Sequence, residues 1–229
     1  MCVKLTDGGK TAVKAIYVIL SATPTRTGAL LRIFTKDPFN HSSISLTEDL
    51  KEMYSFARYK ANNMFVGGLV KEFPQRLSLG KERKVSIKVF KIPVSDKQYE
   101  DVKSFIITLR DDEERNIYNS LAVIGFPFGW GLDTYKAYTC SDFVMKTLLT
   151  GGIVSDSYKD KMITPGQIEH LLEQYLHYSG FLNDYPPALN VQYDTEDFFI
   201  KAGTCREIAN TFRHFYSLIK RNIRARHEL

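Results

Sequence analysis

Cys140 lies in the segment of the chain with the clearest potential for chemistry. Residues 138–144 read YTCSDFV, so a threonine precedes the cysteine and an aspartate follows it by two positions. This pattern predicts a helix that begins at residue 139 or 140 and ends at Gly151 and Gly152. Exposed amides and the helix dipole at such an N-terminus stabilise a thiolate, the nucleophilic form of cysteine. Cys140 is therefore a candidate nucleophile, and an inert buried cysteine on an amphipathic helix is the alternative.

A cysteine nucleophile needs a general base, and His41 is the best placed of the five histidines. It begins residues 41–46 (HSSISL), which have the composition of a strand. We expect the other four to be solvated, two on the polar side of a predicted helix and two in a basic C-terminal segment: His170, His177, His214 and His227.

The base in turn needs a polar group that orients its ring, and the next predicted strand offers two candidates. Ser55 is the first choice. If residues 41–46 and 53–58 form a hairpin, Ser55 is an even number of positions from His41 and shares its face. Glu52 is the alternative, because a carboxylate holds an imidazolium better than a hydroxyl does. However, Glu52 falls at the turn and at an odd offset from His41.

Two loops near these residues contain candidates for substrate binding. Residues 126–132 (FPFGWGL) precede the cysteine helix, and we expect Trp130 and the nearby Tyr138 to form walls of a cleft, with core packing as the alternative. Arg26 and Thr27 lie shortly before the histidine strand. Arg26 could pair with a substrate carboxylate, or it could form a structural ion pair.

The elements that must position these residues follow from hydrophobic periodicity and capping patterns. The short connections between the predicted strands favour antiparallel pairing, so we expect an α+β fold. We expect strands over residues 15–21, 41–46, 53–58, 65–72 and 84–92. We expect helices within 27–36, from Ser95 with Gln98 as its capping-box partner, around 118–124, at Cys140, from Thr164 with apolar residues as far as Leu176, and over about 205–224.

Composition limits the class of protein. The chain has 229 residues, of which 44% are hydrophobic and 25% charged, so we expect one folded domain over residues 1–229, with about 181–229 as a C-terminal helical extension. Three cysteines without a CxxC spacing argue against a disulfide framework or a zinc site, and a reducing, cytoplasmic location fits best. The apolar residues 15–22 resemble a minimal signal peptide but fit a buried strand equally well.

Charge and hydropathy limit the partners. Most of the net charge of +5 falls in the C-terminal segment, so nucleic acid is not expected as a partner. No apolar stretch approaches the roughly 20 residues that span a bilayer. The last predicted helix carries apolar residues on one side and basic residues near them, so it could touch an anionic membrane, although docking on the core is the simpler expectation. The apolar residues of that helix are Ile208, Phe212, Phe215, Leu218 and Ile219.

The order of these segments resembles a known family. Residues 40–46, 53–58 and 139–144 place a histidine, then a polar strand, then a cysteine that follows the histidine by 99 positions. This arrangement resembles the permuted papain-like amidases of the YaeF/YiiX type, which are related to the NlpC-type cell-wall peptidases and to lecithin retinol acyltransferase. The resemblance covers about residues 15–180.

The resemblance implies a circularly permuted papain-like fold, in which the cysteine helix packs against an antiparallel sheet. It implies that Cys140 is the nucleophile, that His41 is the general base and that Ser55 occupies the position of the orienting residue. It also implies that the Cys140 amide helps to form an oxyanion hole. Relatives often carry Glu, His or another strong hydrogen-bonding residue at the third position, so a serine there is a departure from the family.

These observations together predict a cysteine hydrolase that cleaves an amide bond of a small or peptide-like substrate through an acyl-enzyme. This chemistry needs no metal or organic cofactor. Two alternatives remain: an acyltransferase or thioesterase that acts on a lipid, and a non-catalytic binding protein that keeps the fold. The sequence does not determine the oligomeric state.

Overall fold

The structure of the protein is a computed structural model. It describes residues 14–25, 28, 32, 37–81, 84–125, 134–159, 161–189, 191–193, 197–201 and 203–227.

In the described residues, eight strands form one sheet with the order β7-β6-β4-β3-β2-β1-β5-β8. Neighbouring strands are antiparallel except β6 and β7, which are parallel. The strands are β1 (Lys14–Ser21), β2 (His41–Ser45), β3 (Met53–Lys60), β4 (Asn63–Glu72), β5 (Ser86–Val94), β6 (Ile117–Tyr118), β7 (Ala137–Tyr138) and β8 (Leu176–Phe181).

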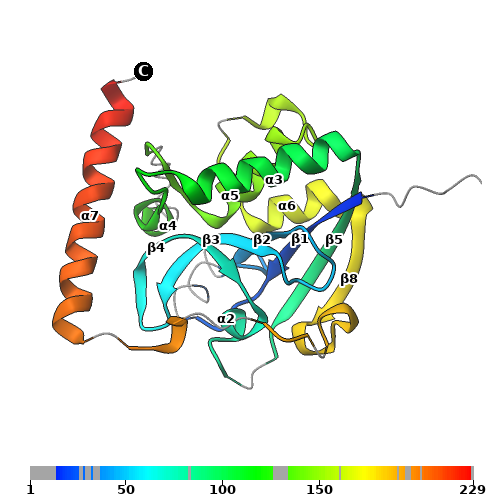
Figure 1. Ribbon diagram of the computed structural model, residues 1–229, viewed down its shortest axis with the longest axis horizontal. Coiled ribbons are helices and arrows are strands. Elements are labelled where there is room, and N and C mark those ends of the chain that lie inside the picture. Colours follow the sequence, from blue (N-terminus) through cyan, green and yellow to red (C-terminus); the bar gives the residue numbers. More distant parts are fainter. Residues whose placement is uncertain are drawn as a thin grey trace, which may run out of the picture.

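Helices α3, α5 and α6 lie together on one side of the sheet (Figure 1). The α-helices are α2 (Pro74–Ser78), α3 (Asp96–Asp111), α4 (Ser120–Gly125), α5 (Cys140–Thr150), α6 (Pro165–Leu172) and α7 (Thr204–His227). Short 3-10 turns occur at η2 (Asp156–Tyr158), η3 (Glu173–Tyr175), η4 (Leu182–Asp184), η5 (Pro186–Ala188) and η6 (Asp197–Phe199).

Strand β1 shows why the sequence of a central strand is almost continuously apolar. Ile16, Val18 and Leu20 point to the side of α3, α5 and α6 and belong to the larger core cluster. Tyr17 and Ile19 point to the opposite side and pack in a second cluster. Because both faces of this strand are buried, nearly every position in it is apolar. The five predicted strands correspond to β1–β5, and the α+β class with a mostly antiparallel sheet is confirmed.

The helix predicted from Thr164 is shorter than expected. It begins as predicted, because Thr164 Oγ1 accepts a hydrogen bond from the Gln167 amide in a capping box. It ends at Leu172, and the continuation to Leu176 is wrong: the chain forms a 3-10 turn and then β8. Strand β8 pairs with the edge of β5, which offers backbone hydrogen bonds that a longer helix could not use.

Two further predictions concern the helix within residues 27–36 and the C-terminal helix. Of the helix predicted within 27–36, only Gly28 and Arg32 are described, and both are helical; the rest of that segment lies outside the described residues. The C-terminal helix is confirmed and extends beyond both predicted ends. It stands at the edge of the molecule next to β4 (Figure 1). No helix in the described part of the chain combines the length and the apolar character needed to cross a membrane.

Candidate active site

Cys140 is the first residue of α5, as predicted. Thr139 caps the helix: its Oγ1 accepts a hydrogen bond of 3.2 Å from the Asp142 amide, and the Asp142 carboxylate accepts one of 2.9 Å from the Thr139 amide. The apolar side of α5, which includes Phe143 and Val144, packs in the core against β2 and β3. The capping box and this packing together fix the thiol at the positive end of the helix dipole.

His41 begins β2, where it pairs with Ser21 of β1. Its side chain is 12% exposed and lies near the Cys140 thiol, close enough for each group to shift the pKa of the other. The structure therefore brings together two residues that are far apart in the chain and that the sequence analysis had selected separately.

Glu72 is the residue that faces the other side of the His41 ring. Both oxygens of its carboxylate lie 3.1 Å from His41 Nε2, and its side chain is only 3% exposed. Because Nε2 is occupied by the carboxylate, Nδ1 is the ring nitrogen left for Cys140. The result is a row formed by a half-buried thiol, a half-buried imidazole and a buried carboxylate, in the order that a catalytic triad has.

Two serines complete the surroundings of this row. Ser43 Oγ donates a 2.6 Å hydrogen bond to Glu72 Oε2, and Ser55 Oγ lies 3.3 Å from His41 Nε2. The register that pairs Ile44 with Tyr54 places Ser43 opposite Ser55. Ser55 therefore shares the face of His41, as predicted, but the charged group that faces the imidazole is Glu72.

Glu52, the other predicted partner of His41, does not reach the site. It precedes β3, is 40% exposed, accepts a 2.5 Å hydrogen bond from the Tyr54 hydroxyl and pairs with Lys71 Nζ at 2.6 Å. The sequence analysis had noted that Glu52 falls at the turn. This position directs its side chain towards β4 rather than towards His41. Sequence reasoning missed Glu72 although an acidic residue at the end of a predicted apolar strand was an available signal.

The electrostatics of the row favour an ion pair. Burial alone would lower the pKa of His41, but the charge of Glu72 raises it to about 10. Burial alone would raise the pKa of the Cys140 thiol, but the hydrogen bond and charge of His41, helped by the Ser42 amide, hold it below its usual value. The His41 charge likewise holds the pKa of Glu72 low against the effect of burial. These directions describe a thiolate next to an imidazolium, the reactive form of such a pair.

Cys140 and His41 lie where two hollows meet. The first has an open volume of about 790 Å³ and is lined by His41, Glu72, Arg58 and Arg76 among others. The second, of about 520 Å³, contains Cys140. Its other lining residues are mainly apolar and include Phe39, Ala122, Val123, Met162, Ile163 and Pro165. Asn40 and Val123 line both hollows, so the two adjoin.

The predicted substrate-binding residues are described only in part. Arg26, Thr27 and Trp130 lie outside the described residues. Tyr138 lies on β7 and packs edge-on against Phe56, with ring centroids 5.0 Å apart, while Lys146 Nζ lies 4.6 Å from the centroid of its ring. Neither hollow includes Tyr138 among its described lining residues, so the structure gives it the packing role that was the alternative.

Of the histidines expected in solvent, His214 is buried, whereas His177 is exposed and has a surface partner. His214 is 7% exposed, and its Nε2 lies 2.9 Å from the Tyr118 carbonyl oxygen, so its predicted solvation is wrong. The cause is the docking of α7 against the body of the protein. His177 lies on β8 rather than on a helix, and its Nε2 is 2.9 Å from Glu48 Oε1.

The described residues contain no group of three or more His, Cys, Asp or Glu side chains placed to hold a metal ion. Comparison with models of known protein families gives no match for this chain, and no curated protein matches it in sequence.

Proposed function

We propose that the protein is a cysteine hydrolase that cleaves an amide bond of a small or peptide-like substrate. One observation carries this proposal: the Cys140 thiol lies beside the His41 ring, and the other ring nitrogen faces the buried Glu72 carboxylate. A structural cysteine in the core has no need of a buried charged pair behind it, since burying such a pair costs free energy.

The residues perform the reaction in two stages. The Cys140 thiolate attacks the carbonyl carbon, and the Cys140 amide, which lies at the helix start and has no partner within the helix, donates to the oxyanion. His41 gives its proton to the leaving nitrogen, so that the C–N bond breaks, the amine departs and an acyl-enzyme remains. His41 then takes a proton from water, the hydroxide releases the acyl group as an acid, and the thiolate is restored.

Glu72 acts as a positioning residue in this scheme. It fixes the ring tautomer with the proton on Nε2 and stabilises the imidazolium that both stages require. Ser43 holds the carboxylate through its 2.6 Å hydrogen bond. A buried glutamate in the third position also removes the departure from the family pattern that a serine there represented.

The same features support a permuted papain-like fold. The cysteine helix packs against an antiparallel sheet, the histidine and glutamate lie on strands of that sheet, and both precede the cysteine in the chain. We also propose a cytoplasmic location, because a reducing compartment keeps a reactive thiol from oxidation.

The first hollow favours a substrate that carries a negative charge. Arg58 and Arg76 both line it together with His41. Burial lowers the pKa of the Arg58 guanidinium, the charge of Glu72 offsets part of this effect, and no ion-pair partner among the described residues lies within 4 Å. A carboxylate on the substrate would supply that partner and would hold the scissile bond near Cys140.

The second hollow supports the alternative function. Its mainly apolar lining next to Cys140 fits an acyl chain, so an acyltransferase or thioesterase that acts on a lipid uses the same Cys140 and His41 chemistry. A binding protein that retains the fold without turnover is the remaining alternative.

Trapping of the acyl-enzyme tests these functions. The protein would be incubated with N-acyl amides and acyl thioesters, with and without a carboxylate, then quenched in acid and mapped by peptide mass. We expect the acyl mass on Cys140, its loss in Cys140→Ala and no change in Cys205→Ala, since Cys205 is an exposed free thiol. Release of the acid to water indicates a hydrolase, and passage of the acyl group to an added acceptor indicates a transferase. No acylation of Cys140 by any compound would contradict both enzyme functions.

A further inference from the structure

The outer side of α7 carries a stripe of large apolar side chains that are exposed to solvent. They recur every three or four positions along the helix, so they share one side of it. The stripe consists of Ile208 (53% exposed), Phe212 (73%), Tyr216 (66%), Ile219 (53%) and Ile223 (52%). A contiguous row of this kind is unusual on a protein surface that faces only water.

The N-terminal half and the middle of α7 are attached to the body by a different side. Phe215 packs against Phe65 with ring centroids 5.3 Å apart, and Leu218 is fully buried. Asn63 Nδ2 donates to Glu207 Oε2 at 2.5 Å and to Thr211 Oγ1 at 3.1 Å. Docking on the core, the simpler expectation from the sequence, therefore accounts for Phe215 and Leu218 but leaves the stripe uncovered.

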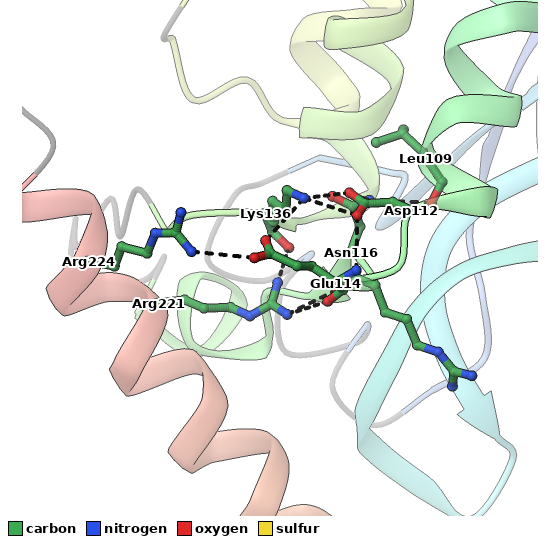
Figure 2. A network of polar contacts seen from close by, with 8 residues as sticks. Leu109, Asp112, Glu114, Asn116, Lys136, Arg221 and Arg224 are labelled. Atoms are coloured by element: carbon green, nitrogen blue, oxygen red, sulfur yellow. Dashed lines mark hydrogen bonds and ion pairs between the residues drawn. The ribbon is translucent and has the colours of Figure 1, made fainter.

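The C-terminal half of α7 is held by a polar network (Figure 2). The Arg221 guanidinium donates to the carbonyl oxygens of Lys136, Glu114 and Arg115 at 2.8–3.0 Å. Arg224 pairs with the Glu114 carboxylate at 3.6 Å. These contacts fix both the position and the rotation of the helix, so the stripe is held outward by the fold.

The stripe lies beside positive charge. Within Thr204–His227 there are six Lys or Arg and one acidic residue, Glu207, so the helix alone carries a net charge of +5, equal to that of the whole chain. At 100° per residue, Arg213 and Lys220 lie next to Tyr216, on the side away from the body. The acidic residue already bonds to Asn63.

We propose that α7 docks along its length on an anionic membrane surface. In this arrangement the stripe enters the boundary between headgroups and acyl chains, while Arg213 and Lys220 contact the lipid phosphates. A second copy of the chain fits less well, because two such helices side by side would bring their basic residues together without acidic partners.

Docking would also bring the first hollow close to the lipid. Met64, which is 38% exposed, lies in a groove with Ile208 and Phe212 and also lines the hollow that contains His41. This consequence rests on the proposed function, whereas the docking itself does not.

Co-sedimentation of the full chain with vesicles tests the proposal. We expect binding to phosphatidylcholine vesicles that contain phosphatidylglycerol, little binding to phosphatidylcholine alone, and weaker binding as salt is added. Arg213→Gln with Lys220→Gln should lower the partition coefficient roughly thirtyfold, at about 1 kcal/mol for each basic residue. Phe212→Ser with Ile219→Ser should lower it at least about tenfold.

Matched variants elsewhere on the surface provide the controls. Lys97→Gln with Lys103→Gln removes the same charge from α3, and Leu189→Ser removes an apolar side chain that is 47% exposed. Neither should change binding, and a thermal melt of each variant establishes that it is folded. The absence of binding to anionic vesicles at low salt, or an equal loss in the control variants, would overturn the proposal. A dimer detected by light scattering that Phe212→Ser abolishes, without vesicle binding, would assign the stripe to a second copy instead.

Discussion

Replacement of Glu72 by glutamine removes the charge behind His41 with almost no change of shape. In Glu72→Gln, a side-chain amide oxygen in the place of Oε2 can still accept a hydrogen bond from His41 Nε2 and one from Ser43 Oγ, which now reach Oε2 at 3.1 Å and 2.6 Å. The experiment therefore separates the effect of charge from the effect of position.

The size of the effect follows from the geometry. Opposite charges 3.1 Å apart attract by about 5 kcal/mol at an effective dielectric constant of about 20. The rise in the pKa of His41 from 6.5 to about 10 corresponds to a similar free energy, about 5 kcal/mol. Without the carboxylate charge, burial alone acts against the imidazolium, so His41 should be largely neutral near pH 7. The Cys140 thiol then loses most of the charge that lowers its pKa.

The assay is the rate of Cys140 alkylation by iodoacetamide, measured by peptide mass mapping from about pH 5 to about pH 9. In Glu72→Gln we expect the midpoint to rise by at least about one pH unit and the rate near pH 6 to fall at least tenfold. Glu52→Gln is the matched control, because the Glu52 carboxylate accepts hydrogen bonds from Tyr54 and Lys71 and does not contact His41. This variant should behave as wild type. Equal midpoints in wild type and Glu72→Gln would refute the role given to this charge.

Three further predictions concern stability. Ser43→Ala leaves the buried Glu72 carboxylate without its shortest hydrogen bond and should cost about 1–3 kcal/mol in urea unfolding, whereas a cost near zero would mean that water replaces the hydroxyl. Thr139→Ala removes the cap that accepts from the Asp142 amide and should cost about 1 kcal/mol, which a thermal melt detects. The pKa of Glu72 is lowered on folding and that of His41 is raised, so stability should fall as the pH drops below about 4.5 and as it rises from about 6.5 towards 10. Urea midpoints should be flatter in Glu72→Gln over both ranges, and unchanged curves would contradict this linkage.

The parts of the site that the sequence predicts are those determined locally. The capping box of Thr139 and Asp142 places Cys140 at a helix start, and the composition of residues 41–46 places His41 on a strand. The face shared by His41 and Ser55 follows from a short hairpin, in which counting residues is enough. Such features depend on a few neighbouring residues, so one sequence is sufficient to find them.

The parts that the sequence does not predict depend on pairing between distant segments. Glu72 reaches His41 only because β4 pairs with β3 in a register that sets Met53 against Glu72, and that register is not visible in composition. Strand β8 forms because β5 has a free edge to pair with. His214 is buried because α7 docks on the body, although the sequence of this helix has the composition of a solvated basic segment.

The relative labelling of Cys140 and Cys205 tests the central claim most directly. Near pH 6, where an ordinary thiol with a pKa of about 8.5 is almost fully protonated, a chloroacetamide should modify Cys140 much faster than the exposed Cys205. In His41→Ala this preference should disappear while Cys205 keeps its rate. Equal, slow labelling of both cysteines in the wild type would contradict an activated Cys140 and, with it, the proposed hydrolase.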